Sequence, residues 1–257
     1  MTTAARRAAT VAGRFHARWL TLLRDQPGNP CGVDVRWFAD DLVATVAVNE
    51  PELRWVQHVA GFAERHLPLL DELLDWYAAR QVPCRFEACD DAAVAVLRDH
   101  GAVVAGPIDL LVGRPSADDG STVAVEEITT DRAEEFANLL LAGHEVATPA
   151  PPHLAAVAGF VDSPEMRCWI AEVDGRPIGA AAFFEDEGVG YLANAATIPA
   201  GRGQGAQTAL IAARLAAALD GGCDLAATLA IPGGSSHRNL VRAGLEPMEH
   251  RHMLHVG

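Results

Sequence analysis

The most complete absence in this 257-residue sequence is lysine, since each of its 20 basic residues is an arginine. The basic residues are also outnumbered by 34 acidic ones, which gives a formal net charge of −14. Nucleic acids and anionic membrane surfaces attract proteins through a basic face. We therefore expect neither a nucleic acid nor a membrane as a partner.

Paired cysteines and long apolar runs are absent as well. The five cysteines are scattered and show no C-x-x-C spacing, which is typical of reduced thiols rather than of disulfides or a zinc site. No stretch approaches the roughly 18 to 20 apolar residues of a membrane span. Arg14 and Arg18 interrupt the N-terminal segment, which predicts an amphipathic helix and no signal peptide. We expect a cytoplasmic protein without a bound metal.

Half of the residues are apolar, which is enough to bury a substantial core. The clearest interruption is at residues 113–122, GRPSADDGST, a segment rich in Gly, Pro, Ser and Asp. Such a composition is typical of a linker. We therefore predict two domains, at residues 1–115 and 122–257.

The C-terminal half alternates between helical and strand periodicity in the order β-α-α-β-β-β-α-β-α-β. Strands are predicted at 123–129, 166–173, 177–184, 190–198, 225–230 and 250–256, and helices at 131–143, 153–161, 207–219 and 235–243. An Asp-Gly pair at 174–175 predicts a tight hairpin turn. A three-strand antiparallel meander followed by a β-α-β crossover predicts a mixed α/β fold, with helices on both faces of the sheet.

The N-terminal half resembles a faint copy of this order. Strands are predicted at 33–38, 42–48, 53–60, 84–89 and 108–112, and helices at 68–80 and 91–100. When the two halves are overlaid, residues 61–66 fall where a glycine-rich loop lies downstream. The order of elements therefore favours an internal duplication, although residue identity between the halves is weak.

That glycine-rich loop spans residues 198–207, IPAGRGQGAQ, between a predicted strand and a predicted helix. Three glycines within five residues allow successive backbone N–H groups to turn toward one point. The N-terminus of the following helix adds its dipole and unpaired amides there. The segment is therefore predicted to bind an anion such as a pyrophosphate, with Arg202 either contacting phosphate or bracing the loop.

The same loop resembles motif A of the GNAT superfamily of N-acetyltransferases, V-x-P-x-x-R-G-x-G, with Ile198 in place of the valine. Residues 235–245, SSHRNLVRAGL, resemble a later helix of that family, which closes on Asn-aromatic-x-x-x-Gly-Phe. The resemblance covers roughly residues 123–256. It implies two GNAT-like domains in tandem, of which residues 1–115 are degenerate and residues 122–257 bind acetyl-CoA.

The resemblance also implies a set of cofactor contacts. Loop amides would hold the CoA pyrophosphate, the preceding strand would pair with the pantetheine arm, and Asn239 would line the CoA path. The implied residues are Ala196, Thr197, Ile198, Arg202, Gly203, Gln204, Gly205, Ala206, Gln207, Thr208 and Asn239.

Two positions depart from the family pattern. Gln207 stands where the family usually has Gly or Ala, which loosens the fit without excluding binding. Leu240 stands where many members carry the tyrosine that protonates the departing thiolate, and leucine has no proton to donate.

The catalytic base is less well defined. Transfer to an amine usually needs a base to remove a proton. The third strand of the C-terminal half offers Tyr191 and Asn194 but no carboxylate, and His144 ends the first helix near the expected acceptor groove. These three are the catalytic candidates, with a capping or surface role as the alternative for His144.

Other polar residues have simpler interpretations. Ser235 is predicted to cap a helix rather than to act as a nucleophile. His250 and His252 would share one strand face while His255 points away, so no metal site is predicted. Residues 61–66 lack the glycine spacing and are predicted not to bind CoA.

The leading hypothesis is an N-acetyltransferase that moves acetyl from acetyl-CoA to a primary amine of a small molecule, by direct attack in a ternary complex. The alternatives are a GNAT-fold protein that binds acyl-CoA without transfer, and a purely structural module. The acceptor, the length of the acyl group and the oligomeric state stay open, with a homodimer as one option.

Overall fold

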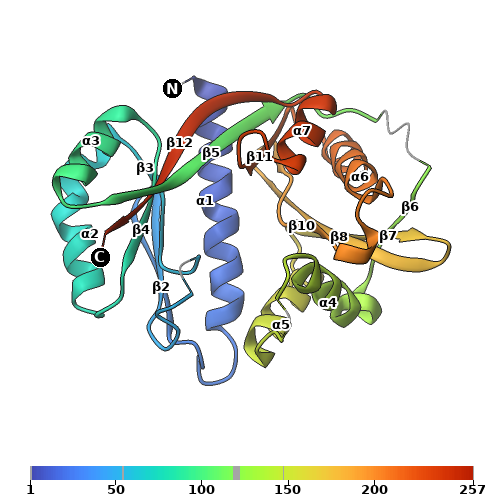
Figure 1. Ribbon diagram of the computed structural model, residues 1–257, viewed down its shortest axis with the longest axis horizontal. Helices are drawn as coiled ribbons and strands as arrows, with labels where there is room; N and C mark the ends of the chain where they lie inside the picture. The colour runs from blue at the N-terminus through green and yellow to red at the C-terminus, as the bar shows by residue number, and fades with distance from the viewer. Residues whose placement is uncertain (1, 54, 118–121, 147, 257) are drawn as a thin grey trace. The chain divides into compact units, whose positions relative to one another are not determined.

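The computed structural model of the protein describes residues 2–53, 55–117, 122–146 and 148–256 (Figure 1). Two compact units are present. Unit 1 comprises Met1–Leu110, Leu229–Pro232 and Pro247–Gly257, and unit 2 comprises Leu111–Thr228 and Gly233–Glu246. The division differs from the one expected at residues 115 and 122, because two C-terminal segments group with the N-terminal residues. Residues 118–121 of the predicted linker lie outside the described residues.

Unit 1 is built on a mixed sheet with the strand order β1-β2-β3-β4-β12-β5. Its elements are α1 (Thr3–Arg24), β1 (Val33–Ala39), β2 (Leu42–Ala47), β3 (His58–Phe62), η1 (Glu64–Leu69), α2 (Leu70–Ala78), β4 (Cys84–Ala88), α3 (Asp91–Asp99), β5 (Val103–Gly113) and β12 (Glu246–Val256). The last strand of the chain, β12, lies antiparallel to β4 and sets Leu254 opposite Phe86. This pairing explains why the C-terminal residues belong to unit 1.

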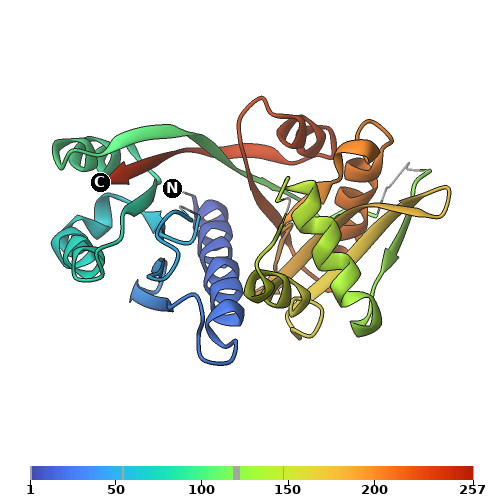
Figure 2. The same ribbon diagram turned by 60° about the horizontal axis from the view of Figure 1, so that its bottom comes forward.

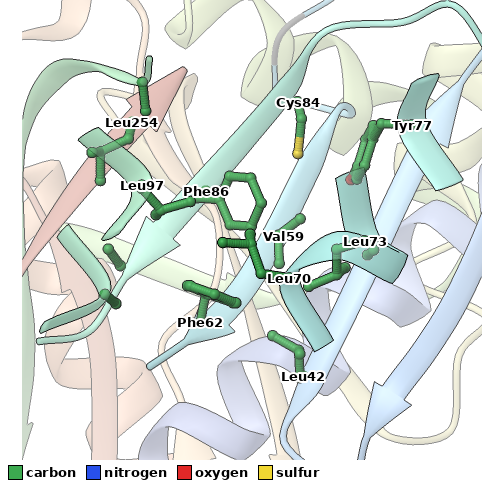
Figure 3. Close-up of a cluster of buried hydrophobic side chains, with 14 of the residues drawn as sticks. Leu42, Val59, Phe62, Leu70, Leu73, Tyr77, Cys84, Phe86, Leu97 and Leu254 are labelled. Carbon is green, nitrogen blue, oxygen red and sulfur yellow. The ribbon is translucent and has the colours of Figure 1, made fainter. Parts of the chain in front are cut away.

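Helices cover both faces of the unit 1 sheet, so β2 is buried along its whole length (Figures 1 and 2). On one face, Leu42 packs in a core with Leu73 of α2 and Leu97 of α3, and Leu254 joins this cluster (Figure 3). On the other face, Val43 packs against Ala17 of α1. Alternate residues of one strand therefore supply two cores, as the two-residue repeat of a strand requires.

Two predicted elements of the N-terminal half begin elsewhere. The strand predicted at 53–60 starts only at His58, because Leu53 and Val56 donate their N–H groups within successive turns. The helix predicted at 68–80 is preceded by the 3₁₀ helix η1, which contains Pro68. Proline lacks the N–H that a continuous α-helix through this point would use.

Unit 2 has the strand order β11-β9-β8-β7-β6, and β10 pairs with β8. Its elements are β6 (Ala124–Glu127), η2 (Thr130–Arg132), α4 (Ala133–Gly143), α5 (Pro151–Ala158), β7 (Met166–Val173), β8 (Arg176–Asp186), β9 (Val189–Tyr191), β10 (Ala195–Thr197), η3 (Pro199–Gly201), α6 (Ala206–Asp220), β11 (Leu225–Ala230) and α7 (Ser235–Arg242). The β9–β11 pair is parallel, whereas β6, β7, β8 and β9 pair antiparallel. The predicted mixed α/β fold is therefore confirmed.

The β7–β8 hairpin turns at Asp174 and Gly175, where the sequence predicts a tight turn. Both residues have positive φ, 50° and 70°, a conformation that Asp and Gly adopt more readily than most residues. The turn sets the register of the hairpin, with Val173 opposite Arg176.

The single strand predicted at 190–198 is wrong, because two strands, β9 and β10, occupy this segment. Between them, Leu192 donates its N–H to the carbonyl of Ala227 on β11, and Thr228 donates its hydroxyl to the carbonyl of Leu192. The chain then leaves β11, and among the described strands β10 pairs with β8 alone. Residues 192–194 therefore form a break in the strand.

A buried polar network runs through unit 1. Thr45 donates its hydroxyl to the carbonyl of Val56 (2.7 Å) and so accepts from Nε2 of His16 (3.0 Å). The His16 ring lies 4.8 Å from the ring of His58, whose Nε2 is 3.5 Å from Oε2 of Glu87. Glu87 also pairs with the buried Arg251 of β12.

Acid should destabilise unit 1 through this network. Burial and the neighbouring His58 hold the pKa of His16 well below 6.5. Burial alone would raise the pKa of Glu87, but Arg251 and His58 together lower it to about 2. Folding lowers both pKa values. The contribution of the two groups to the free energy of unfolding is therefore complete above their unfolded-state pKa values, and it falls as the pH drops below about 6.5 for His16 and below about 4.5 for Glu87. Urea unfolding at pH 7.5, 6 and 5 measures the part of this loss that comes from His16.

The variant His16→Gln should remove most of the pH dependence between pH 7.5 and 5, because its side chain does not titrate. His100→Gln is the control, since His100 lies exposed at the end of α3. Equal pH dependence in wild type and His16→Gln would contradict the assignment.

Among the described residues, no helix combines the length and the apolar character that a membrane span requires.

Candidate functional site

A cavity of about 810 Å³ in unit 2 brings together four segments that are separate in the sequence. They are the end of α4, strand β10, the glycine-rich loop with the start of α6, and α7. The lining residues are Gly143, His144, Ala195, Ala196, Thr197, Gly201, Arg202, Gly203, Gly205, Ala206, Gln207, Thr208, Ser235, Ser236, Asn239 and Arg242.

The glycine-rich loop leads into α6 without a side-chain cap. Gly203 and Gly205 have φ of 80° and 88°, and Gly205 is the N-cap residue of the helix. In this part of the described chain no side chain accepts from the first turn of α6. The first N–H groups of a helix have no partner within the helix. The start of α6 therefore offers free donors and a positive dipole end to the cavity.

Two glycines let the cavity walls approach closely. A Cβ atom on Gly143, at the end of α4, would lie 2.5 Å from Cβ of Ala196 on β10. A Cβ atom on Gly201 would lie 2.6 Å from Cβ of Ile178 on β8. Neither contact is sterically possible, so α4 and the loop can pack against the strands as they do only because both residues lack a side chain.

Arg202 is held at the rim of the cavity. Its Nη2 lies 2.7 Å from Oε1 of Glu145, and both side chains are more than half exposed. The same nitrogen is 3.5 Å from the carbonyl oxygen of Gly143. Of the two roles that the sequence left open, the present geometry corresponds to bracing the loop.

Strand β10 presents one edge to β8, where Ala196 lies opposite Ala180. The sheet order places no second strand beside it among the described residues. The hydroxyl oxygen of Thr197 is buried and has no hydrogen-bond partner in that part of the chain. The backbone along Ala195–Thr197 can therefore pair with an extended ligand lying in the cavity.

Helix α7 contributes a polar wall. The side chain of Arg242 donates to Oδ1 of Asn239 at 2.6 Å, and both residues line the cavity. The predicted cap at Ser235 is wrong, because Gly234 is the N-cap and Ser235 is the first helical residue. Ser235 instead lines the cavity. Leu240 is only 3% exposed and packs in the interior.

Of the three predicted catalytic residues, only His144 lines the cavity. It is the C-cap residue of α4. Desolvation lowers the pKa of His144 below 6.5, although the residue retains an exposed surface. A neutral imidazole at physiological pH can accept a proton.

The remaining candidates lie outside the cavity lining. Tyr191 is buried on β9, between β8 and β11. Asn194 lies in the strand break and accepts from the N–H of Ala182 through its backbone carbonyl. Ile198 packs against the unit 2 core, and Gln204 donates to the carbonyl of Ala200.

Sequence reasoning missed several lining residues, namely Gly143, Ala195, Gly201, Ser236 and Arg242. The helical spacing of Ser235, Ser236, Asn239 and Arg242 could have indicated a shared polar face. The role of Gly143 carries no local signal, because it depends on the approach of β10, which is remote in the sequence.

The loop at residues 61–66 of unit 1 uses carboxylates of the chain itself. The N–H of Glu64 donates to Oδ2 of Asp90 at 2.9 Å. Arg65 and His66 both contact Asp41, at 2.6 Å and 2.9 Å. A nearby cavity of about 350 Å³ is lined by Asp90 and Glu249 together with Arg65. Three donors of the loop, the N–H of Glu64 and the side chains of Arg65 and His66, thus already have a carboxylate partner.

The C-terminal histidines form a separate pair in unit 1. The rings of His250 and His252 lie 5.2 Å apart, as expected for residues on one strand face. Nδ1 of His250 is 2.6 Å from Oδ1 of Asp109.

Comparison with known protein families gives a match over much of unit 2. Residues 128–238 match the family model described as "Acetyltransferase (GNAT) family". The match contains the glycine-rich loop, β10, α6 and most of the cavity lining. A search of curated proteins gives no match.

Solved structures share the fold over most of the chain. A GCN5-related N-acetyltransferase from Kribbella flavida has a TM-score of 0.66 at 21% identity, covering 99% of this chain and 96% of that one. One from Sphaerobacter thermophilus has a TM-score of 0.59 at 15% identity, covering 97% and 92%. A functionally unknown conserved protein from Staphylococcus epidermidis has a TM-score of 0.58 at 11% identity, covering 86% and 94%.

The exposed Arg202–Glu145 pair yields a prediction about anion binding. The variant Glu145→Gln should bind inorganic pyrophosphate roughly two- to fivefold more tightly, because Arg202 is released and one negative charge leaves the rim. Glu134→Gln is the control, since Glu134 is exposed near the other end of α4. Calorimetric titration at low salt measures both variants. Equal tightening in the control would mean that only net charge matters.

Proposed function

We propose that the GNAT acetyltransferase domain at residues 128–238 binds acetyl-CoA in the unit 2 cavity and transfers the acetyl group to a primary amine of a small molecule. The observation that carries the proposal is the convergence of two features on one cavity. An uncapped helix start with a glycine-rich loop lines the cavity, and so does strand β10, which pairs on one edge only among the described strands. These features match the pyrophosphate and the amide-bearing arm of CoA.

The pyrophosphate would lie at the start of α6. Gly203 and Gly205 to Thr208 line the cavity at this point, and the dipole of the 15-residue helix favours negative charge there. No Asp or Glu is among the cavity-lining residues of the described chain, so no carboxylate opposes the phosphates inside it. Arg242 and Arg202 supply positive charge at two sides of the cavity.

The pantetheine arm would lie along β10. Its amide groups are spaced to hydrogen-bond with an extended backbone, as an added strand does. Residues Ala195–Thr197 offer that backbone, and Ala196 leaves the side-chain space small. This direction carries the thioester toward the strand break at residues 192–194.

The transfer would proceed by direct attack. The amine nitrogen attacks the thioester carbonyl carbon, so a C–N bond forms and the C–S bond breaks. The electron pair of the C–S bond leaves with sulfur as the CoA thiolate, and the amine gives up one proton. His144 is the group of the cavity best suited to accept that proton, because its lowered pKa keeps it neutral.

The departing thiolate needs a proton or a hydrogen-bond donor. Leu240 has no proton to give and is buried. The hydroxyl groups of Ser235 and Ser236 line the cavity and are the candidates within α7.

Binding without transfer is the second candidate function. It is favoured by the buried Leu240 and by the lack of a carboxylate among the described lining residues. Release of free thiol from acetyl-CoA, measured with a panel of small primary amines, separates the two functions. Amine-dependent thiol release supports transfer. Tight acetyl-CoA binding with no release above the amine-free rate supports binding alone.

A duplicated origin of the two halves is a further part of this proposal. In unit 1, strands β1 to β3 lead through a loop and α2 to β4, which lies parallel to β3. In unit 2, strands β7 to β9 lead through β10, a loop and α6 to β11, which lies parallel to β9. The shared order supports a degenerate first copy whose loop donors are satisfied by Asp90 and Asp41.

Gly203→Asp tests the site of the pyrophosphate. Its carboxylate would face the phosphates, so we expect acetyl-CoA affinity to fall by roughly tenfold or more, the equivalent of about 1.4 kcal/mol. Gly175→Asp is a matched control in the β7–β8 turn. Both glycines have positive φ, 80° and 70°, and neither has an atom within 4 Å of an added Cβ. Titration calorimetry with acetyl-CoA on both folded variants measures this change in affinity. An unchanged affinity in Gly203→Asp would contradict the proposal.

His144→Gln tests the base. We expect kcat to fall by roughly 100-fold or more, with little change in acetyl-CoA affinity. In wild type, the kcat of the complex should rise with pH through an apparent pKa below 6.5, and this step should vanish in the variant. A retained step in the variant would assign the base to another group.

A further inference from the structure

Arg214 of α6 is a cation in the interior of unit 2, with only 2% of its surface exposed. Within the described chain no carboxylate pairs with it, since its contacts are all to backbone carbonyl groups. Burial lowers its pKa to about 9, which still leaves the side chain protonated at neutral pH. A buried charge without a counter-ion is costly, and an apolar side chain of similar size would fill the space at less cost.

The guanidinium group of Arg214 contacts three backbone carbonyl groups. Nε donates to the carbonyl of Leu210 in its own helix, at 2.9 Å. Nη1 donates to the carbonyl of Ala193 at 2.8 Å and lies 3.5 Å from the carbonyl of Ala182. Ala193 is in the strand break, and in the described part of the chain no backbone N–H donates to its carbonyl.

The strand break also leaves donors without partners. The carbonyl of Asn194 accepts from the N–H of Ala182 at 2.8 Å. For the N–H groups of Ala193 and Asn194, by contrast, no acceptor occurs in the described chain. The next residue, Ala195, lines the cavity.

The carbonyl of Ala193 and the N–H of Asn194 belong to the same peptide group. A charge-assisted hydrogen bond to the oxygen draws electron density out of that group. The N–H at its other end then becomes a stronger donor, as in any chain of polarised hydrogen bonds. Arg214 therefore acts on Asn194 through one rigid, planar unit.

We propose that Arg214 is a positioning residue, which polarises the Ala193–Asn194 peptide so that the N–H of Asn194 holds the carbonyl oxygen of a bound acyl thioester. This inference rests on the proposed function. Negative charge builds on that oxygen when an amine attacks the carbonyl carbon. Fixed donors and nearby charge in a site shielded from water stabilise it.

The carbonyl stretching frequency of bound acetyl-CoA reports this effect without an acceptor or turnover. Isotope-edited infrared spectra with [1-¹³C]acetyl-CoA should show a band below the free frequency in wild type. In Arg214→Met, which keeps apolar bulk but removes the charge, most of this shift should be lost. In Arg214→Lys, which keeps a charge and a donor, a large part should remain.

Thr228→Val is the matched control, because it removes a neutral hydrogen bond to Leu192 in the same break. Its band should stay near that of wild type. CoA without the acetyl group should bind Arg214→Met nearly as well as wild type, since the pyrophosphate site is untouched. With an amine that is turned over, kcat should fall by about 10- to 100-fold, less than for deletion of an oxyanion donor outright.

A folded Arg214→Met with the wild-type band would overturn the inference, as would an equal loss in Thr228→Val. If Arg214→Met fails to fold, Arg214→Gln and Arg214→Lys decide, because only lysine keeps the charge and should keep the shift. Equal bands in these two variants would also overturn it. A wild type that binds no acetyl-CoA would contradict the proposed function itself, whereas binding with an unshifted band would contradict only the role of Arg214.

Discussion

The break in backbone pairing between β9 and β10 is the constraint on which the rest of unit 2 depends. β9 lies parallel to β11, but β10 pairs with β8 alone among the described strands and so keeps one edge open there. The polar groups released at the break need partners, because burying them unpaired is costly. Thr228 donates to the carbonyl of Leu192 and Arg214 donates to the carbonyl of Ala193, while two N–H groups have no acceptor in the described chain. A cavity with an open strand edge follows directly from this arrangement.

The loop before α2 in unit 1 and the loop before α6 in unit 2 show how two strand-to-helix loops can be used differently. In unit 2, glycines with positive φ leave the start of α6 free of side chains. In unit 1, Asp90 accepts from the loop at Glu64 and also caps α3 through Ala93. The carboxylate of Asp90 thus stabilises the start of α3 and also accepts a hydrogen bond from the loop N–H of Glu64. A loop can therefore bind an external anion or an internal one, and the side chains around it decide which.

Much of the fold could be predicted from sequence, and the reasons are local. The short apolar runs of β7 and β11 and the Asp174–Gly175 turn fix those elements within a few residues. The break at residues 192–194 could not be predicted, because the apolar run from Gly190 to Ile198 reads as one strand. Likewise, the pairing of β12 with β4 depends on segments far apart in the sequence. The loop motif and the strand before it pointed to about half of the residues that line the cavity, whereas the positions of Gly143 and Arg214 depend on tertiary contacts.

The central claim is that the chain has one acetyl-CoA site, built on the open strand edge and the free helix start of unit 2. The most direct measurement is the stoichiometry of acetyl-CoA binding to the folded, full-length protein by titration calorimetry. The account predicts one acetyl-CoA per chain. A folded protein that binds none, or two per chain with similar affinity, would contradict it.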